Sequence, residues 1–178
     1  MTARALFLDR DGVINVDADH VHRIADFAFI PGVFETLTAF QAEGYLLIIV
    51  TNQGGIGRGL YTETDFRVLT DWMLREFAIR HITISKVYFS PCHPIHGVGT
   101  FKRDSYFRKP NPGMILQAQK DFDLNLVESV LVGDKESDIE AGNRAGVGTL
   151  VLLTPPGSKP VSKANHIVST ISELISLL

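Results

Sequence analysis

The sequence predicts an α/β protein in which a doubly wound parallel sheet lies between two layers of helices. Short, continuously apolar runs, which are typical of strands buried on both faces, alternate along the chain with amphipathic segments at helical spacing. The 178 residues, 45% of them hydrophobic, are enough for one globular domain over residues 1–178 with an ample core.

Local signals place the individual elements. Strands are expected at the apolar runs 3–8, 45–50, 84–89, 129–132 and 147–153. Helices are expected at 31–43, from the cap Thr62 to about Phe77, and at 112–122, 137–145 and 171–178, because prolines, a capping threonine and glycine stops mark most of their ends. The connections 15–30 and 90–111 are longer than a compact domain needs, and such loops are usually functional.

Charge and cysteine content narrow the class of protein. A net charge of −3 and a pI near 6.0 give no general attraction to nucleic acid or to an anionic membrane. The single cysteine, Cys92, fits a reducing compartment, and no apolar run is long enough for a transmembrane helix. We therefore expect a cytoplasmic monomer without a signal peptide that acts on a small molecule, with no nucleic-acid or membrane partner.

Polar residues gather where the predicted strands end. Ligands of doubly wound sheets bind at the carboxyl ends of the strands, so these residues should share one crevice. They are Asp9 and Asp11 after the first strand, Thr51, Asn52 and Gln53 with Gly54 and Gly55 after the second, Arg108 and Lys109 in the following loop, and Asp134 and Asp138 after the fourth.

The acids predict a metal and a covalent intermediate. Asp9 and Asp11 are two residues apart at the end of a buried strand, and with Asp134 they would repel one another unless a cation neutralised them. Oxygen ligands of this kind suit Mg²⁺. Asp9 is the candidate nucleophile and Asp11 the candidate general acid and base, with Thr51 and Lys109 as phosphate-binding groups. Asp138 alone is adequately explained as a helix cap.

Four motifs resemble those of the haloacid dehalogenase superfamily of phosphatases, and they occur in the family's order. They are Asp9-Arg10-Asp11-Gly12-Val13, Thr51-Asn52, Lys109-Pro110, and Gly133-Asp134 with Asp138. The resemblance implies a three-layer, Rossmann-like fold. No insertion between the motifs is large enough for a full cap domain.

Longer segments resemble the histidinol-phosphatase-like branch and, within it, the D-glycero-D-manno-heptose 1,7-bisphosphate 7-phosphatases; they read "DRDGVIN", "TNQGGIGRGLYT", "RKPNPGM" and "VGDKESDIEAG". The implied reaction removes the C7 phosphate of a sugar bisphosphate on the route to nucleotide-activated heptose for surface polysaccharide such as lipopolysaccharide. The implied Mg²⁺ ligands are Asp9, Asp134 and the Asp11 carbonyl, and the implied substrate contacts are Asn52, Gln53, Arg58, Arg108 and Lys109.

One part of the chain departs from that family's pattern. The family commonly has a zinc loop before the Arg-Lys-Pro motif, but three of the four ligand positions here are Ser90, Ser105 and Phe107. Only Cys92 remains, with His93 and His96 nearby, so structural zinc is not expected. We expect Phe101, Tyr106 and Phe107 to order the loop by packing on the domain instead.

Other functions share the same residues. A phosphatase of histidinol phosphate or of another small phosphoester would use the same chemistry, because the motifs specify the reaction and not the leaving group. A non-enzymatic phospho-acceptor switch also groups aspartates, a threonine and a lysine, but its acceptor lies on a middle strand. His20 and His22 could approach a substrate, although exposed loop histidines are the commoner case.

Overall fold

The computed structural model describes residues 2–158 and 160–178, and over these residues it confirms the predicted α/β architecture. Six parallel strands form one sheet in the order β3-β2-β1-β4-β5-β6. They are β1 (Arg4–Leu8), β2 (Tyr45–Asn52), β3 (Ile84–Ser90), β4 (Val130–Gly133), β5 (Thr149–Leu153) and β6 (His166–Val168). The five predicted strands are confirmed, whereas β6, a three-residue edge strand, was not predicted from its short apolar run.

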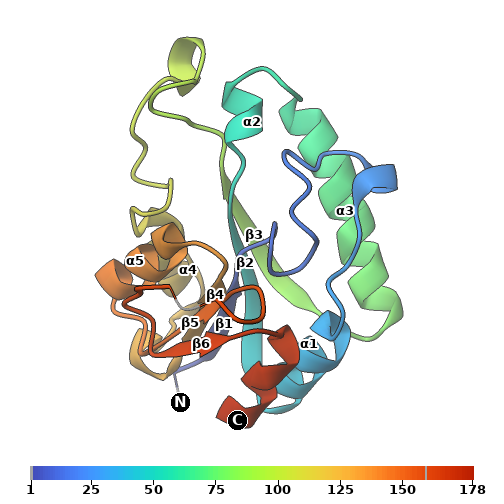
Figure 1. Ribbon diagram of the computed structural model, residues 1–178, viewed down its shortest axis with the longest axis vertical. Coiled ribbons are helices and arrows are strands. Elements are labelled where there is room, and N and C mark those ends of the chain that lie inside the picture. Colours follow the sequence, from blue (N-terminus) through green and yellow to red (C-terminus); the bar gives the residue numbers. More distant parts are fainter. Residues whose placement is uncertain (1, 159) are drawn as a thin grey trace.

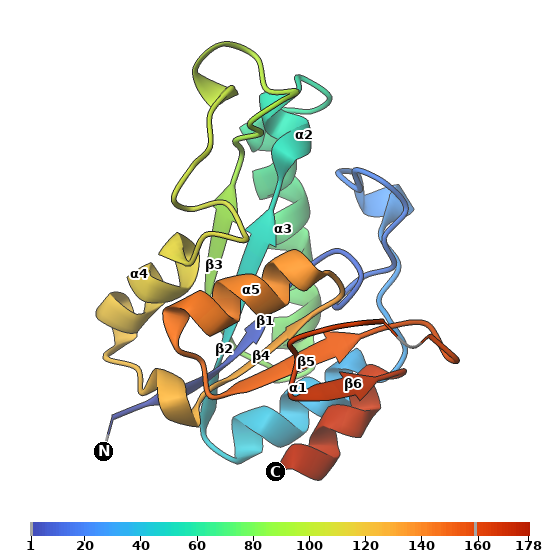
Figure 2. The same ribbon diagram turned by 60° about the vertical axis from the view of Figure 1, so that its left-hand side comes forward.

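Helices cover both faces of the sheet. Helices α1 (Val33–Ala42) and α3 (Glu63–Ile79) lie on one face, and α4 (Gly113–Phe122) and α5 (Glu136–Ala145) lie on the other (Figures 1 and 2). Each face has its own buried apolar cluster, which includes Leu6 and Leu8 on the first side and Ala5 and Phe7 on the second. This alternation explains why β1 is apolar at every position from Ala5 to Leu8.

Shorter helices complete the structure. A single turn, α2 (Gly54–Gly57), follows β2, and 3-10 helices occur at η1 (Ile24–Asp26), η2 (Gly99–Phe101), η3 (Leu126–Glu128) and η4 (Ile171–Leu177). The predicted terminal helix is therefore present in the tighter 3-10 form. It packs against α1 through the buried side chains of Ile171 and Leu174. Among the described residues, no helix combines the length and hydropathy needed to span a bilayer.

The strand order fixes the place of the functional site. The chain leaves β1 toward β2 on one side and leaves the adjacent β4 toward β5 on the other. A crevice opens between two strands whose connections diverge in this way, at their carboxyl ends. Asp9 follows β1 and Asp134 follows β4, so both aspartates lie at this point.

Gly12 allows the chain to turn directly over Asp134. Its φ is 86°, in the left-handed region, and a Cβ at this position would collide with the Asp134 carboxyl group. Glycine is therefore required twice, for backbone conformation and for space.

The segment between β3 and α4 projects beyond the sheet (Figures 1 and 2). Of the three aromatic residues expected to anchor it, only Phe101 packs on the domain, against the cluster of Ile56, Tyr61 and Phe66. The expectation was wrong for Tyr106 and Phe107, whose exposed fractions are 57% and 42%. Main-chain hydrogen bonds and the side chains of Arg103 and Arg108 hold the segment instead.

Cys92 is the centre of those contacts. Arg103 Nε donates to its thiol Sγ at 3.4 Å, and Arg108 Nη1 donates to its carbonyl at 2.9 Å. His93 Nδ1 accepts from the backbone amides of Ile95 and His96 at 3.2 and 3.0 Å. The side chains of Cys92 and His93, two of the three that could have bound a metal, thus help to order the loop.

We predict that purified protein contains no stoichiometric zinc, because one thiol and a histidine with an occupied Nδ1 make a poor tetrahedral site. Elemental analysis after purification in zinc-supplemented medium measures this directly. In buffer without Mg²⁺, a zinc chelator should also leave the thermal unfolding midpoint unchanged. Zinc at one ion per chain would contradict this account of the loop.

We also predict that Gly12→Ala lowers the free energy of unfolding by clearly more than Gly44→Ala. Both positions have nearly equal positive φ, 86° and 81°, but open space surrounds Gly44. Gly44→Ala should therefore cost only the backbone strain of about 1–2 kcal/mol, whereas Gly12→Ala must also displace Asp134. Urea denaturation of both variants compares the costs, and equal losses would refute the close approach.

Candidate active site

The carboxyl ends of the central strands open into a cleft of about 470 Å³. Most of the predicted site residues line it, namely Asp9, Asp11, Asn52, Gln53, Arg58, Arg108 and Lys109. Thr51 is fully buried and contacts Gln53 in the wall, and Asp134 lies beside Asp9. The sheet thus brings the four motifs to one place.

Lys109 is buried among acids. Its ammonium Nζ lies 2.6 Å from Asp138 Oδ1 and 3.0 Å from Asp9 Oδ1, and it donates to the Val50 carbonyl at 2.7 Å. An ammonium has three protons, so these contacts use all of its donors. Asp9 Oδ1 also accepts from the backbone amide of Arg10 at 2.7 Å, which fixes the orientation of this carboxylate.

Charge repulsion and burial act together on the acids. Burial raises the pKa of Asp9 to about 7, with Asp138, Asp134 and Asp11 adding to the rise and Lys109 opposing it. Burial likewise raises the pKa of Asp134 to about 6 against the opposing charge of Lys135. Burial alone would lower the pKa of Lys109, but the neighbouring carboxylates outweigh it and hold the value above the ordinary one.

The acids fit a divalent metal ion. Asp9, Asp134 and Asp138 each offer a carboxylate oxygen, and these oxygens lie within 4.8 Å of one another. Asp134 Oδ1 is buried and has no hydrogen-bond partner among the described residues. An uncompensated buried carboxylate oxygen is costly, and a hard cation such as Mg²⁺ satisfies it.

Asp138 has two roles in this cluster. Its Oδ2 accepts from the Lys135 amide at 3.0 Å and so caps α5, as the helix-cap interpretation expected. Its other oxygen, Oδ1, lies 2.6 Å from the Lys109 ammonium, a contact that the sequence did not predict. The same side chain therefore connects the start of α5 to the buried lysine.

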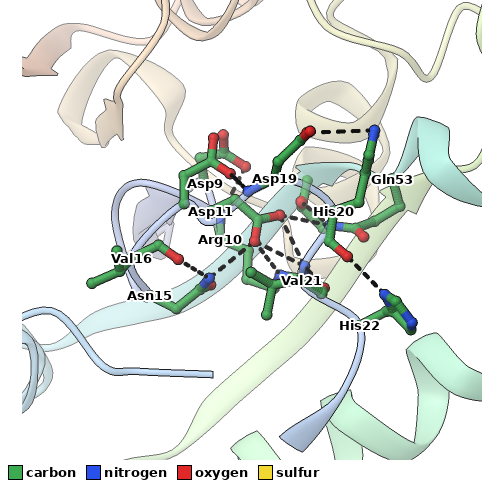
Figure 3. Close-up of polar contacts among 12 residues, drawn as sticks. Asp9, Arg10, Asp11, Asn15, Val16, Asp19, His20, Val21, His22 and Gln53 are labelled. Atoms are coloured by element: carbon green, nitrogen blue, oxygen red, sulfur yellow. Dashed lines mark hydrogen bonds and ion pairs between the residues drawn. The ribbon is translucent and has the colours of Figure 1, made fainter. Parts of the chain in front are cut away.

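Asp11 has a different environment from Asp9, although only one residue separates them. Its carboxylate accepts from the Arg10 guanidinium at 2.9 Å and from Asn15 Nδ2 and Gln53 Nε2 at 3.0 Å each (Figure 3). Arg10 is itself 1% exposed and also donates to the Val21 carbonyl. Asp11 is therefore held by neutral and cationic donors apart from the acid cluster.

Asn52 and Gln53 use their amides within the protein. Asn52 donates to the Lys109 carbonyl and accepts from the Lys109 amide, both at 3.0 Å. This pair of bonds fastens the loop segment before α4 to the end of β2. These amides already have protein partners. Their predicted role as substrate contacts stays a prediction.

Basic side chains form the rim of the cleft. Arg58 Nη1 lies 2.9 Å from His20 Nε2, and His93 lies near Arg108 across Gly54, where a Cβ would approach both side chains. Burial, followed by the charge of Arg108, lowers the pKa of His93. His20 lines the cleft, although an exposed loop position is the commoner expectation for such a histidine.

Several cleft residues were missed from the sequence. Lys135 forms ion pairs with Asp17 at 3.1 Å and with Asp134 at 3.5 Å, which links the 15–30 loop to the end of β4. Its position next to the Asp134 motif could have drawn attention to it. The other missed residues are Asp17, Asp19, Tyr61, His93 and Ser137. Tyr61 and Ser137 lie in segments that resemble the family and His93 was considered only for zinc, whereas Asp17 and Asp19 look like ordinary loop residues.

Comparisons with known proteins agree with this site. A family model described as HAD-hydrolase-like matches residues 106–174. The chain is 55% identical to the D-glycero-alpha-D-manno-heptose-1,7-bisphosphate 7-phosphatase of Burkholderia mallei, over all of this chain and 95% of that protein. It is 45% identical to the D-glycero-beta-D-manno-heptose-1,7-bisphosphate 7-phosphatase of Vibrio cholerae, over 96% and 91% of the two chains.

A solved structure shares the fold. The D,D-heptose 1,7-bisphosphate phosphatase from B. bronchiseptica, complexed with magnesium and phosphate, superposes with a TM-score of 0.83 at 24% identity, over 98% of this chain and 97% of that one. Together with the full-length identity to the curated relatives, this places the motifs in a known fold. The chain therefore belongs to the heptose-1,7-bisphosphate 7-phosphatase family of haloacid dehalogenase-like hydrolases.

Proposed function

We propose that this phosphatase removes the C7 phosphate of D-glycero-D-manno-heptose 1,7-bisphosphate through a phosphorylated Asp9, acting in the cytoplasm as a one-domain monomer. The observation that carries the chemistry is the contrast between the two aspartates of the first motif. Asp9 is held by Lys109 within the acid cluster, and Asp11 is held separately at the same cleft. Two carboxylates in different environments can take different roles.

In the first step, an Asp9 carboxylate oxygen attacks the phosphorus atom. The bond between phosphorus and the sugar oxygen breaks, and Asp11 gives its proton to that oxygen. In the second step, water attacks phosphorus, Asp11 takes the water proton, and the bond between phosphorus and Asp9 breaks. The products are an alcohol and inorganic phosphate, and both aspartates return to their starting states.

Neighbouring residues support these steps. Lys109 orients Asp9 and places a positive charge next to the reacting oxygen. Asp9, Asp134 and the Asp11 carbonyl are the proposed Mg²⁺ ligands, and the ion would neutralise charge on the transferring phosphoryl group. The Thr51 hydroxyl is the proposed donor to a phosphoryl oxygen.

The size and charge of the cleft fit a sugar bisphosphate. Arg58 and Arg108 stand at the rim and could neutralise the phosphate that is kept. The relatives act on both anomers according to their names, with the alpha enzyme at 55% identity and the beta enzyme at 45%. This difference favours the alpha anomer as the preferred substrate.

We predict that a phosphate-release screen with Mg²⁺ gives the highest kcat/KM for heptose 1,7-bisphosphate. Sugar monophosphates and histidinol phosphate should be poorer substrates, because they lack the second phosphate for the rim arginines. The alpha and beta anomers are assayed separately. A higher kcat/KM for histidinol phosphate would replace the proposed substrate while leaving the chemistry in place.

We further predict that Mg²⁺ stabilises the folded protein more at about pH 8 than at about pH 5. The raised pKa values mean that the folded, metal-free protein holds protons on Asp9 and Asp134 that the unfolded chain has already lost. The protons held by Asp9 and Asp134 contribute fully to the free energy of unfolding below about pH 4, and this contribution is lost as the pH rises through about 6 to 7. Mg²⁺ competes with these protons, so its benefit grows over the same range.

Thermal unfolding with and without Mg²⁺ at both pH values measures the effect. Asp134→Asn should lose most of the Mg²⁺-dependent increment. The matched control is Asp121→Asn, at an exposed carboxyl whose pKa is lowered by its hydrogen bond with Tyr88, and it should keep the full increment. An increment that does not change with pH, or that survives in Asp134→Asn, would contradict the proposed ligands.

A further inference from the structure

Gln53 connects Asp11, the proposed general acid and base, to Thr51, whose hydroxyl is the proposed hydrogen-bond donor to the phosphoryl group. The side chain is 2% exposed, and its Nε2 donates to Asp11 Oδ2 at 3.0 Å and to Thr51 Oγ1 at 2.9 Å. Once Asp11 has given up its proton, its carboxylate can only accept hydrogen bonds, so in that state the amide nitrogen must face Asp11. Both amide protons are then used, and the amide orientation is determined by its partners.

This arrangement has a consequence for Thr51. Its oxygen accepts the proton of Gln53, so its own hydroxyl proton remains available for another acceptor. The single amide of Gln53 therefore fixes the Asp11 carboxylate and also directs the Thr51 hydroxyl toward donation. Both groups are oriented relative to each other by one side chain.

Tyr61 holds Gln53 in this orientation. The Tyr61 hydroxyl donates to Gln53 Oε1 at 2.6 Å, the remaining polar atom of the amide. Burial raises the pKa of Tyr61 to about 12, so the hydroxyl keeps its proton and stays a donor at working pH. If the amide turned over, two oxygens would face each other at Asp11 and the tyrosine would lose its acceptor.

Two neighbouring residues fix the position of the Tyr61 ring. One side lies against Gly55, where a Cβ would collide with ring atoms. The ring also stacks on His22 with a centroid distance of 4.9 Å and an interplanar angle of 2°. Gly55 and His22 therefore fix the ring that carries the hydroxyl, and this explains one glycine of the segment after β2.

We propose that Tyr61 and Gln53 are positioning residues for proton transfer by Asp11. This inference rests on the proposed function, since it requires Asp11 to be the general acid. In the first step the proton of Asp11 must reach the leaving oxygen as its bond to phosphorus breaks. A carboxyl group that is displaced by the loss of its amide partner transfers this proton less well, whereas Asp9 and Lys109 remain in place.

The dependence on the leaving group tests the proposal. Tyr61→Phe removes only the hydroxyl, and we expect kcat/KM for an alkyl phosphate such as the sugar bisphosphate to fall about 5- to 10-fold, the effect of one hydrogen bond. The nitrophenolate ion leaves without a proton, so kcat/KM for p-nitrophenyl phosphate should change less than about 2-fold. Gln53→Met should show a larger ratio between the two substrates, together with a loss common to both, because Gln53 also orients the Thr51 hydroxyl.

Two reference variants make the result specific. Tyr88→Phe removes a tyrosine hydroxyl that also donates to an acid, Asp121, but outside the cleft, and it should leave both substrates unaffected. Asp11→Asn should show the largest leaving-group dependence. Equal losses on both substrates in Tyr61→Phe and Gln53→Met would overturn the positioning role and indicate a general structural role. Absence of leaving-group dependence in Asp11→Asn would instead overturn the proposed function.

Discussion

The buried ammonium of Lys109 is the interaction on which the rest of the site depends. It lies between Asp9 and Asp138 and is anchored on the Val50 carbonyl, so it joins strand β2 to residues that follow β1 and β4. Without it, several carboxylates would meet in a place with little water, at a cost that burial makes severe. Asn52 holds the backbone of Lys109 through two hydrogen bonds, and Asp138 holds its side chain while capping α5. The contacts that fix the position of Lys109 therefore also fix the position of the nucleophile Asp9.

The strand order of the sheet brings the acids together, and the loops set their final positions. Divergence of the chain from β1 and β4 brings Asp9 and Asp134 together, and Gly12 lets the first loop pass over Asp134. Four carboxylates, those of Asp9, Asp11, Asp134 and Asp138, then face three paired cationic side chains, Arg10, Lys109 and Lys135. The remaining negative charge fits the binding of a cation, which would in turn neutralise an incoming phosphoryl group. Asp11 escapes the cluster because Arg10, Asn15 and Gln53 bind its carboxylate, and this separation lets it handle protons while Asp9 bonds to phosphorus.

Much of this arrangement could be predicted from the sequence, for reasons that differ by residue. Asp9, Asp11 and Asp134 follow apolar runs, and Lys109 directly precedes a proline, so the positions of these charged residues carried information. The roles of Asn52 and Gln53 could not be derived, because an amide beside a phosphate site and an amide that orients neighbouring groups look the same in sequence. The contacts that order the 90–108 segment could not be predicted either. The hydrogen bond from Arg103 to the Cys92 thiol, for example, exists only because of how the loop folds. Tyr61 lies in a segment that resembles the family, but its role could not be derived, because it arises from a hydrogen bond to a residue eight positions away.

The central claim is that Asp9 becomes phosphorylated, and trapping that intermediate tests it most directly. The Asp11→Asn variant should still accept a phosphoryl group from p-nitrophenyl phosphate, whose leaving group needs no proton, but should lose it slowly because water is no longer activated. Rapid acid quench followed by peptide mass spectrometry should find one phosphoryl group on the peptide that contains Asp9, and hydroxylamine should remove it. The account is contradicted if the variant turns over p-nitrophenyl phosphate without any labelled peptide, or if the label lies on a peptide that lacks Asp9.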